Sequence, residues 1–307
     1  MGEFTINTEG VPFNLRYTLE SGQSFRWQEK GEWWVGVMSG GVVKLKQEGA
    51  ALVCVTSSDA LNSHAVYDYL GLGSDLERIL ASIMKDGTIT EAVQKFYGLR
   101  LMKQEVWECL VSFAIATNSN IPRIRGMVSN LCDRLGDRVE FEGTVHSLFP
   151  TADRVAQAEL PDLVACGLGY RAKFVKSIAE SVSLGRVNLD ELRLHDYAKA
   201  RELLIEDLPG RKTLMGIGPK VADCVLLFSC DKDSAFPIDV WIARVLDGYY
   251  PHLFDGDLKE RLASTVSGKT SLSLATYDRL SASARAYFGV FAGYAQQYLF
   301  HYERMRD

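Results

Sequence analysis

The chain has 307 residues, of which 47% are hydrophobic. This is enough for the cores of about two domains and excludes a disordered tail or a disulfide-stapled miniprotein. There are 34 Lys and Arg residues against 39 Asp and Glu residues, and the formal net charge of −5 excludes a protein that binds nucleic acid through bulk electrostatics. No apolar run approaches the roughly 20 residues that span a bilayer, and the N-terminus lacks the basic and apolar regions of a signal peptide. We therefore expect an intracellular protein with no membrane partner.

The cysteines and histidines do not indicate a metal site. The 6 cysteines and 5 histidines are dispersed, and most of the cysteines lie inside apolar helical patterns without any C-x-x-C pair. Because cysteine behaves as a small hydrophobe, we expect buried free thiols in a reducing compartment. Structural zinc and iron–sulfur sites need closely spaced ligands, so we expect no metal of either kind.

The N-terminal part of the sequence predicts a small antiparallel sheet. Short β-branched or aromatic runs, separated by glycine-rich breaks, occupy residues 24–27, 33–38, 42–46 and 52–56. From about residue 65 the spacing is helical and predicts helices over 75–84, 104–116, 121–135, 172–182, 197–205, 221–230, 240–246 and 291–304. Strands followed by helices indicate an α+β fold. We expect an N-terminal antiparallel β domain with flanking helices over residues 1–90 and a mostly α-helical domain over residues 91–307.

Local charge differs from the total charge. Residues 163–177 contain Arg171, Lys173 and Lys176 and no acid, and Arg123 and Arg125 stand together at the start of a predicted helix. Solvated helix faces explain such clusters without any partner. The sequence has no poly-basic tail, so a nucleic-acid contact would have to come from the folded body.

The segment 214–224, Leu-Met-Gly-Ile-Gly-Pro-Lys-Val-Ala-Asp-Cys, predicts a turn between two helices. Gly216 and Gly218 suit a close turn, and Pro219 suits the first turn of a helix, where its missing N–H costs nothing. The amides that open such a helix form an anion site suited to a DNA phosphate. Lys220 lies in that first turn, where the helix dipole favours the neutral, nucleophilic amine. A solvent-facing lysine on an ordinary turn stays the alternative.

Asp239 follows Pro237 at the start of another apolar helix. As an N-cap it would accept backbone N–H bonds, which is worth on the order of 1 kcal/mol. A carboxylate fixed there near a lysine can also stabilise a developing cation or move protons, as cleavage of a glycosidic bond through an oxocarbenium-like state requires. The two roles are compatible.

These two motifs resemble those of the helix-hairpin-helix DNA glycosylases, and the rest of the chain resembles their 8-oxoguanine branch. The hairpin, residues 208–230, is followed by the Pro-x-Asp segment as in that family. Further blocks match in order at residues 21–27, 108–124, 168–172 and 294–300. The resemblance covers about residues 10–302 and implies an enzyme of base excision repair that acts on double-stranded DNA.

The resemblance implies which residues react and which bind the damaged base. Lys220 matches the lysine that attacks the sugar C1′ and forms a Schiff base, which permits strand cleavage by β-elimination, and Asp239 matches its paired aspartate. The backbone carbonyl of Gly22 matches the acceptor of the N7–H that 8-oxoguanine has and guanine lacks. The other pocket positions match a residue that binds the Watson–Crick edge of the flipped base, Gln296, and two that sandwich its ring, Cys224 and Phe300.

The resemblance also implies contacts to the opposite strand. Asn118, Arg123 and Arg171 match the group that holds the estranged cytosine, and Tyr170 matches the side chain wedged into the base stack. Taken alone, each of these residues has an ordinary structural explanation, such as a helix end, a surface charge or a half-buried aromatic.

Trp241 departs from the family pattern. Better-known eukaryotic members carry a histidine there, close to the phosphate of the damaged nucleotide. Tryptophan bears no charge, so binding of the phosphate at Trp241 must differ. Gly216 and Gly218 of the hairpin match the other contacts to the DNA backbone. Related iron–sulfur glycosylases have clustered cysteines near the C-terminus, but the last cysteine here is Cys230, which excludes that subgroup. The resemblance implies no cofactor, but it admits a monovalent cation that bridges hairpin carbonyls to a phosphate.

We therefore expect a monomeric, bifunctional DNA glycosylase and AP lyase that excises 8-oxoguanine, preferably opposite cytosine. It would act in the cytoplasm or nucleoid of a prokaryote or in the nucleus of a eukaryote. One alternative is a helix-hairpin-helix glycosylase for another damaged base, against which Gly22 argues. The other is a non-catalytic DNA-binding protein, against which Asp239 and the aromatic sandwich argue.

Overall fold

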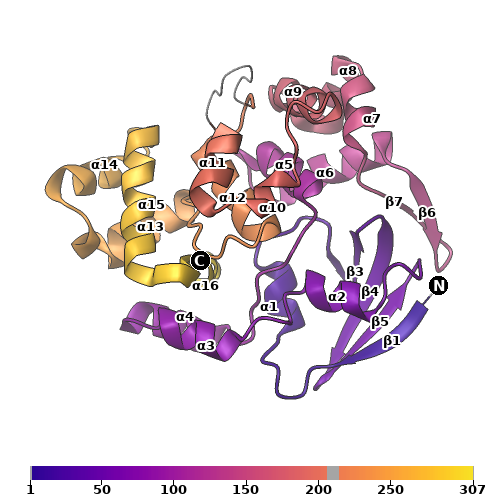
Figure 1. Cartoon of the computed structure of the whole chain (residues 1–307), viewed down its shortest axis with the longest axis horizontal. Helices are drawn as coiled ribbons and strands as arrows, with labels where there is room; N and C mark the ends of the chain where they lie inside the picture. The colour runs from indigo at the N-terminus through magenta and orange to yellow at the C-terminus, as the bar shows by residue number, and fades with distance from the viewer. Residues whose placement is uncertain (1, 206–213, 307) are drawn as a thin grey trace.

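The computed structural model describes residues 2–205 and 214–306 and has an antiparallel sheet beside a larger helical body (Figure 1). The 5-stranded sheet has the order β1-β5-β4-β3-β2. Its strands are β1 (Gly2–Asn7), β2 (Gln28–Lys30), β3 (Trp33–Met38), β4 (Gly41–Glu48) and β5 (Ala51–Thr56). Ser39 and Gly40, both at positive φ, form the two-residue turn between β3 and β4, as the predicted glycine-rich break requires. The α+β fold class is confirmed.

The prediction of a strand over residues 24–27 was wrong, because this segment joins two hydrophobic cores instead of pairing with a strand. Phe25 is buried in the core of the helical body, whereas Trp27 is buried in the core of the sheet. The indole Nε1 of Trp27 donates to the hydroxyl of Tyr69 at 3.0 Å. Strand β1 was not predicted, since its place in the sheet depends on pairing with β5, which lies far along the chain.

The predicted helices are all present, with ends that shift by a few residues. The described α-helices are α1 (Leu15–Glu20), α2 (Ser63–Tyr69), α3 (Leu76–Ile83), α4 (Gly87–Lys95), α5 (Val106–Ala116), α6 (Ile121–Leu135), α7 (Ala152–Gln157), α8 (Leu160–Leu163), α9 (Arg171–Ser183), α10 (Glu191–Leu194), α11 (Tyr197–Ile205), α12 (Pro219–Ser229), α13 (Val240–Tyr249), α14 (Gly256–Val266), α15 (Leu274–Phe288) and α16 (Ala292–Arg304). Short helical turns lie at Val164–Leu168, Pro251–Leu253 and Gly289–Phe291. Helices α14 and α15 and the small hairpin of β6 (Arg138–Phe141) and β7 (Thr144–Ser147) were not predicted.

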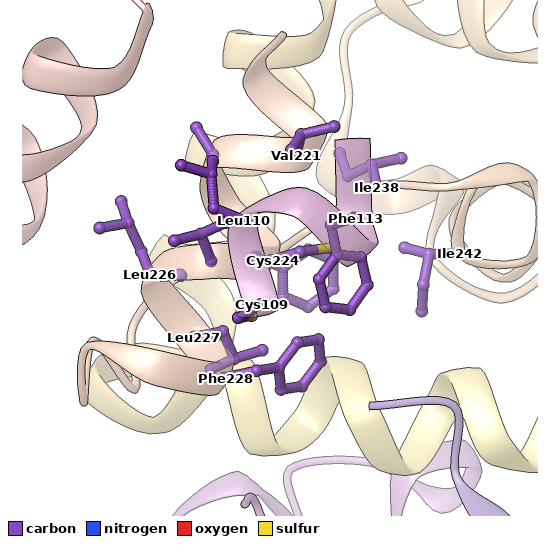
Figure 2. Close-up of a cluster of buried hydrophobic side chains, with 14 of the residues drawn as sticks. Cys109, Leu110, Phe113, Val221, Cys224, Leu226, Leu227, Phe228, Ile238 and Ile242 are labelled. Carbon is purple, nitrogen blue, oxygen red and sulfur yellow. The ribbon is translucent and has the colours of Figure 1, made fainter. Parts of the chain in front are cut away.

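Helices α5 and α12 form the centre of the body, between the sheet and the group α13–α16 (Figure 1). Figure 2 shows how Cys109, Leu110 and Phe113 of α5 pack against apolar residues of α12. The rings of Phe113 and Phe228 stack with centroids 5.5 Å apart and an interplanar angle of 20°. This apolar contact fixes the helix that begins with the hairpin motif.

Helix α16 joins the end of the chain to its first part. It packs against α13 and α15. It also packs against α3, which belongs to the predicted N-terminal domain of residues 1–90, and against α4, which crosses the boundary of that domain. The division at residue 90 therefore stays a prediction. Of the predicted hairpin 208–230, residues 208–213 lie outside the described residues.

No described helix is long and apolar enough to cross a membrane. All six cysteines are buried and unpaired with one another. Within residues 2–205 and 214–306, no group of three or more His, Cys, Asp or Glu side chains is placed to hold a metal ion.

Gly293 sets how closely α16 approaches α12, and we expect Gly293→Ala to destabilise the protein. A Cβ at Gly293 would lie 2.2 Å from Cδ1 of Leu227, 2.8 Å from the carbonyl oxygen of Asp233 and 2.9 Å from that of Ala235. Two of these neighbours are backbone atoms, so relief requires the helix to move, and overpacking of this kind costs about 1–3 kcal/mol. Denaturant unfolding measures the loss.

Gly126→Ala is the matched control. Gly126 also lies inside a helix, α6, but a Cβ there would meet nothing within 4 Å. Alanine should therefore stabilise that helix by about 0.5–1 kcal/mol. Equal effects of the two substitutions would show that the contact at Gly293 does not limit the approach of α16.

Candidate active site

The hairpin places Lys220 in the first turn of α12. Gly218 is the N-cap and Pro219 the first residue of the helix, as predicted. Gly216 has a φ of +86°, and a Cβ there would lie 2.5 Å from the ring of Phe174 in α9, so only glycine permits this close approach. The Nζ of Lys220 lies 4.9 Å from the centroid of the Phe113 ring. The amine therefore stands on an aromatic face at the junction of α5 and α12.

The structure brings Asp239 and Cys224 into the electrostatic range of Lys220. Asp239 is the N-cap of α13 and accepts a hydrogen bond from the amide of Ile242 at 2.9 Å. Burial raises the pKa of its carboxyl group, and the charge of Lys220 opposes this rise. Burial raises the pKa of the Cys224 thiol to about 12, again against the effect of Lys220. An amine, a buried carboxylate and a neutral thiol thus share one site.

A buried polar network connects the helix of Lys220 with the segment of Asp239. Asp223 has no exposed surface and accepts hydrogen bonds from the hydroxyls of Tyr197 at 2.8 Å and Tyr277 at 2.7 Å. The hydroxyl of Tyr277 in turn accepts from the amide of Ile238, the residue before Asp239, at 3.1 Å. One carboxylate and one phenol therefore link α12, α15 and the start of α13.

The charge of Asp223 is compensated from α11. Nε of Arg201 lies 3.2 Å from Oδ1 of Asp223. Burial nevertheless raises the pKa of Asp223 to about 6, against the effects of Arg201 and of both phenols. The sequence did not predict this network, although an aspartate three residues after Lys220 in an otherwise apolar helix was a signal that a partner must exist.

The predicted base-pocket residues Gly22 and Phe300 lie together. Gly22 has a φ of +81°, and a Cβ there would lie 3.1 Å from Cε1 of Phe300 and 3.4 Å from Cδ1 of Ile121. Gln296, one turn before Phe300 on α16, is buried, and its Oε1 has no hydrogen-bond partner among the described residues. Because buried polar atoms are almost always paired, this oxygen is a candidate ligand-binding group.

Asn118, Tyr170 and Arg171 also form one cluster. Asn118 is exposed at a φ of +51°, and its Nδ2 lies 3.5 Å from the hydroxyl of Tyr170. The ring of Tyr170 is exposed and lies under the guanidinium of Arg171, 4.5 Å from its carbon. Arg171 itself is buried, and it donates to the carbonyls of Thr117 at 2.8 Å and Asn118 at 3.0 Å. In this structure Arg171 therefore holds the loop that carries Asn118.

Two further predicted residues lie on the first turns of helices. Arg123 is exposed at the start of α6, which Asn120 caps. Trp241 is half-buried at the start of α13, and the guanidinium carbon of Arg244 lies 4.9 Å from its ring centroid. A cation thus accompanies the tryptophan, which has no charge of its own. No hydrogen bond or ring contact joins Arg123 to the Asn118 cluster among the described residues.

Comparisons with known proteins agree over nearly the whole chain. Residues 5–110 match the family model of the 8-oxoguanine DNA glycosylase N-terminal domain, and residues 111–262 match that of the HhH-GPD superfamily of base excision DNA repair proteins. The N-glycosylase/DNA lyase of Saccharomyces cerevisiae is 30% identical over 98% of this chain and 86% of its own length. The N-glycosylase/DNA lyase OGG1 of Arabidopsis thaliana is 29% identical over 97% of this chain and 79% of its own length.

Two solved structures extend the comparison to three dimensions. MBOgg1 in complex with a low-affinity DNA ligand superposes with a TM-score of 0.85 at 31% identity, over 100% of this chain and 97% of that chain. The Clostridium acetobutylicum 8-oxoguanine glycosylase/lyase, in complex with DNA that has cytosine opposite 8-oxoguanine, superposes with a TM-score of 0.80 at 28% identity, over 96% of this chain and 92% of that chain. The chain therefore belongs to the 8-oxoguanine DNA glycosylase family, whose members are DNA-binding glycosylase/lyases of base excision repair.

Proposed function

We propose that this chain excises 8-oxoguanine paired with cytosine from duplex DNA and then cleaves the abasic strand, with Lys220 as nucleophile and Asp239 as its acidic partner. The observation that supports this proposal is the buried carboxylate of Asp239 within electrostatic range of the amine of Lys220, with both residues at the N-termini of helices. The chain would act as a monomer on genomic DNA.

The chemistry follows from these two groups. After the damaged nucleotide is flipped out, the neutral amine of Lys220 attacks C1′ while the bond from C1′ to N9 breaks and the base leaves. The carboxylate of Asp239 stabilises the positive charge that develops on the sugar and accepts the proton that the amine loses. The departing base takes the proton from Asp239. The bond from C1′ to O4′ then breaks, O4′ takes a proton from water, and the opened sugar is bound to Lys220 as a protonated Schiff base. This Schiff base acidifies the C2′ proton, and loss of that proton expels the 3′ phosphate by β-elimination.

Recognition of the damaged base would use the pocket around Gly22. The Gly22 carbonyl accepts the N7–H of 8-oxoguanine, and the unpartnered Oε1 of Gln296 accepts from the Watson–Crick edge. Phe300 stacks on one face of the ring and Cys224, a neutral thiol, contacts the other. The hydrogen bond from N7–H to the Gly22 carbonyl would then distinguish 8-oxoguanine from guanine.

The opposite strand would be read at the cluster of Asn118, Tyr170 and Arg171, together with Arg123. The exposed ring of Tyr170 is free to enter the base stack, and Asn118 presents its amide beside it. The buried hydroxyls of Thr117 and Ser119 have no hydrogen-bond partner among the described residues, which supports a ligand at this loop.

The hairpin would bind the DNA backbone through the amides that open α12, with Trp241 and its neighbour Arg244 at the start of α13. The carbonyls of Met215, Gly216 and Ile217 accept no backbone hydrogen bond among the described residues. Carbonyl oxygens are suitable ligands for an alkali cation, so these three carbonyls would hold such a cation if one binds. The cation would supply positive charge that attracts a DNA phosphate.

Lys220→Gln should abolish chemistry and leave DNA binding within a few-fold of the wild type, because glutamine is polar and only slightly shorter than lysine but has no nucleophilic amine. Borohydride should trap the wild type covalently on a duplex with 8-oxoguanine and should fail to trap the variant. A wild type that releases the base efficiently but resists trapping would contradict the lysine mechanism. Release from duplexes with other damaged bases tests the alternative substrate class.

Asn118→Gly should weaken the preference for cytosine about tenfold, since one polar contact to the estranged base is lost. Glycine tolerates the positive φ at this position, so the loop keeps its shape. Single-turnover excision from duplexes with each of the four opposite bases measures the preference. An unchanged ranking of opposite bases would remove Asn118 from the proposed reading of the opposite strand.

Tyr277→Phe should lower kcat about tenfold with little change in KM, because the link between Asp223 and the amide of Ile238 is lost. Tyr277 lowers the pKa of Asp223, so its loss should raise that pKa above about 6 and move the acidic limb of the pH–rate profile to higher pH. The control is Tyr287→Phe, which removes a phenol of the same helix that donates to Asp86 at 3.0 Å. Similar pH–rate profiles for both variants would argue against a positioning role for Tyr277.

A further inference from the structure

The loop that follows α1 is bound by two side chains of α16. Nη2 of Arg304 donates to the carbonyl of Glu20 at 2.5 Å. Nε2 of Gln297 donates to the carbonyl of Ser21 at 2.7 Å, and Gln297 is almost completely buried. Both bonds span more than half of the chain. They attach the residues directly before Gly22 to the helix that carries the proposed base-pocket residues.

The Gly22 carbonyl differs from its neighbours in this loop, whose carbonyls accept hydrogen bonds from side chains. The carbonyl of Gln23, on its other side, accepts from Nε2 of Gln104 at 2.8 Å. The Gly22 carbonyl accepts no hydrogen bond from any residue in the described ranges 2–205 and 214–306. Gly22 also lies against Phe300, at the pocket. Side chains therefore fix the carbonyls before and after Gly22, and the Gly22 carbonyl between them is left able to accept a hydrogen bond from a ligand.

Two neighbouring faces of α16 have different tasks and meet at Arg304, whose guanidinium carbon also lies 5.6 Å from the ring centroid of Phe300. Gln297 and Arg304 are seven residues apart and therefore lie on one face of the helix, which contacts the loop. Gln296 and Phe300, four residues apart, lie on an adjacent face and belong to the proposed pocket. A single rigid helix thus carries both the pocket wall and the residues that set the position of the Gly22 carbonyl.

We propose that Gln297 and Arg304 are positioning residues that determine specificity, by holding the loop so that the Gly22 carbonyl meets the N7–H of the flipped 8-oxoguanine. This inference rests on the proposed function, in which Gly22 is that acceptor. Discrimination by a single hydrogen bond depends on the position of its acceptor, because such bonds weaken steeply with misalignment. A loop released from α16 would lose recognition of the base and keep the reacting pair intact.

The test compares two reactions of the full chain, and only the first of them requires recognition of the damaged base. The first is single-turnover excision from a duplex with 8-oxoguanine opposite cytosine. The second is strand cleavage of the same duplex carrying a preformed abasic site, which needs Lys220 but not Gly22. Gln297→Met keeps the volume of the side chain and removes the donor, and we expect it to slow excision about tenfold and to leave abasic-site cleavage within twofold. Equal losses in both reactions would overturn the proposal.

Arg304 gives a second, independent pair of variants. Arg304→Met should show the same selective loss, and Arg304→Lys, which retains a donor, should restore most of the excision rate. A loss of abasic-site cleavage in Arg304→Met equal to its loss of excision would mean that Arg304 binds the DNA phosphate instead of the loop. This pair also keeps the proposal testable if Gln297→Met does not fold.

Tyr298→Phe is the matched control for a buried hydrogen bond on the same helix. The Tyr298 hydroxyl donates to the carbonyl of Leu99 at 2.9 Å instead of to the carbonyls of Glu20 or Ser21, so both reactions should keep their wild-type ratio. A selective loss of excision in this variant would assign the effect to general loosening of α16 and overturn the proposal. A wild type that excises guanine as fast as 8-oxoguanine would instead contradict the proposed function itself.

Discussion

The arrangement of the site depends on one buried negative charge. Asp223 has no exposed surface, and a buried carboxylate without partners costs several kcal/mol. Its partners are the guanidinium of Arg201 and the phenols of Tyr197 and Tyr277, which come from α11 and α15. Because the charge lies on α12, its compensation fixes both neighbouring helices against the helix of the nucleophile.

The same requirement extends to the acidic partner. Tyr277 accepts from the amide of Ile238, so the segment that ends in the N-cap of α13 is held by a group already bound to α12. The partners that compensate the charge of Asp223 therefore also set the positions of Lys220 and Asp239 relative to each other. No direct contact between these two side chains is required. Helix α16 organises the other half of the site, since it packs on both parts of the chain and binds the loop of Gly22.

Features with local signals could be predicted from the sequence. The turn at Gly216 and Gly218, Pro219 as the first helical residue and Asp239 as an N-cap all depend on residues within a few positions of one another. Helix α15 was missed because serines and alanines separate its apolar residues, which leaves a weak periodic pattern. The bond from Tyr277 to Asp223 joins residues 54 positions apart, and sequence spacing contains no information about such a pair. Arg171 resembled a surface charge for the same reason, since its acceptors are carbonyls 53 and 54 positions away.

The positive φ of Asn118 has a kinetic consequence. A non-glycine residue in this conformation costs free energy that other contacts must offset, and the hydrogen bonds from Arg171 to the carbonyls of Thr117 and Asn118 do so. The loop is therefore ordered before DNA arrives, and association spends no free energy on ordering it. A loop that is already formed adds no folding step to association, so its own rearrangement does not limit the rate at which it engages a duplex.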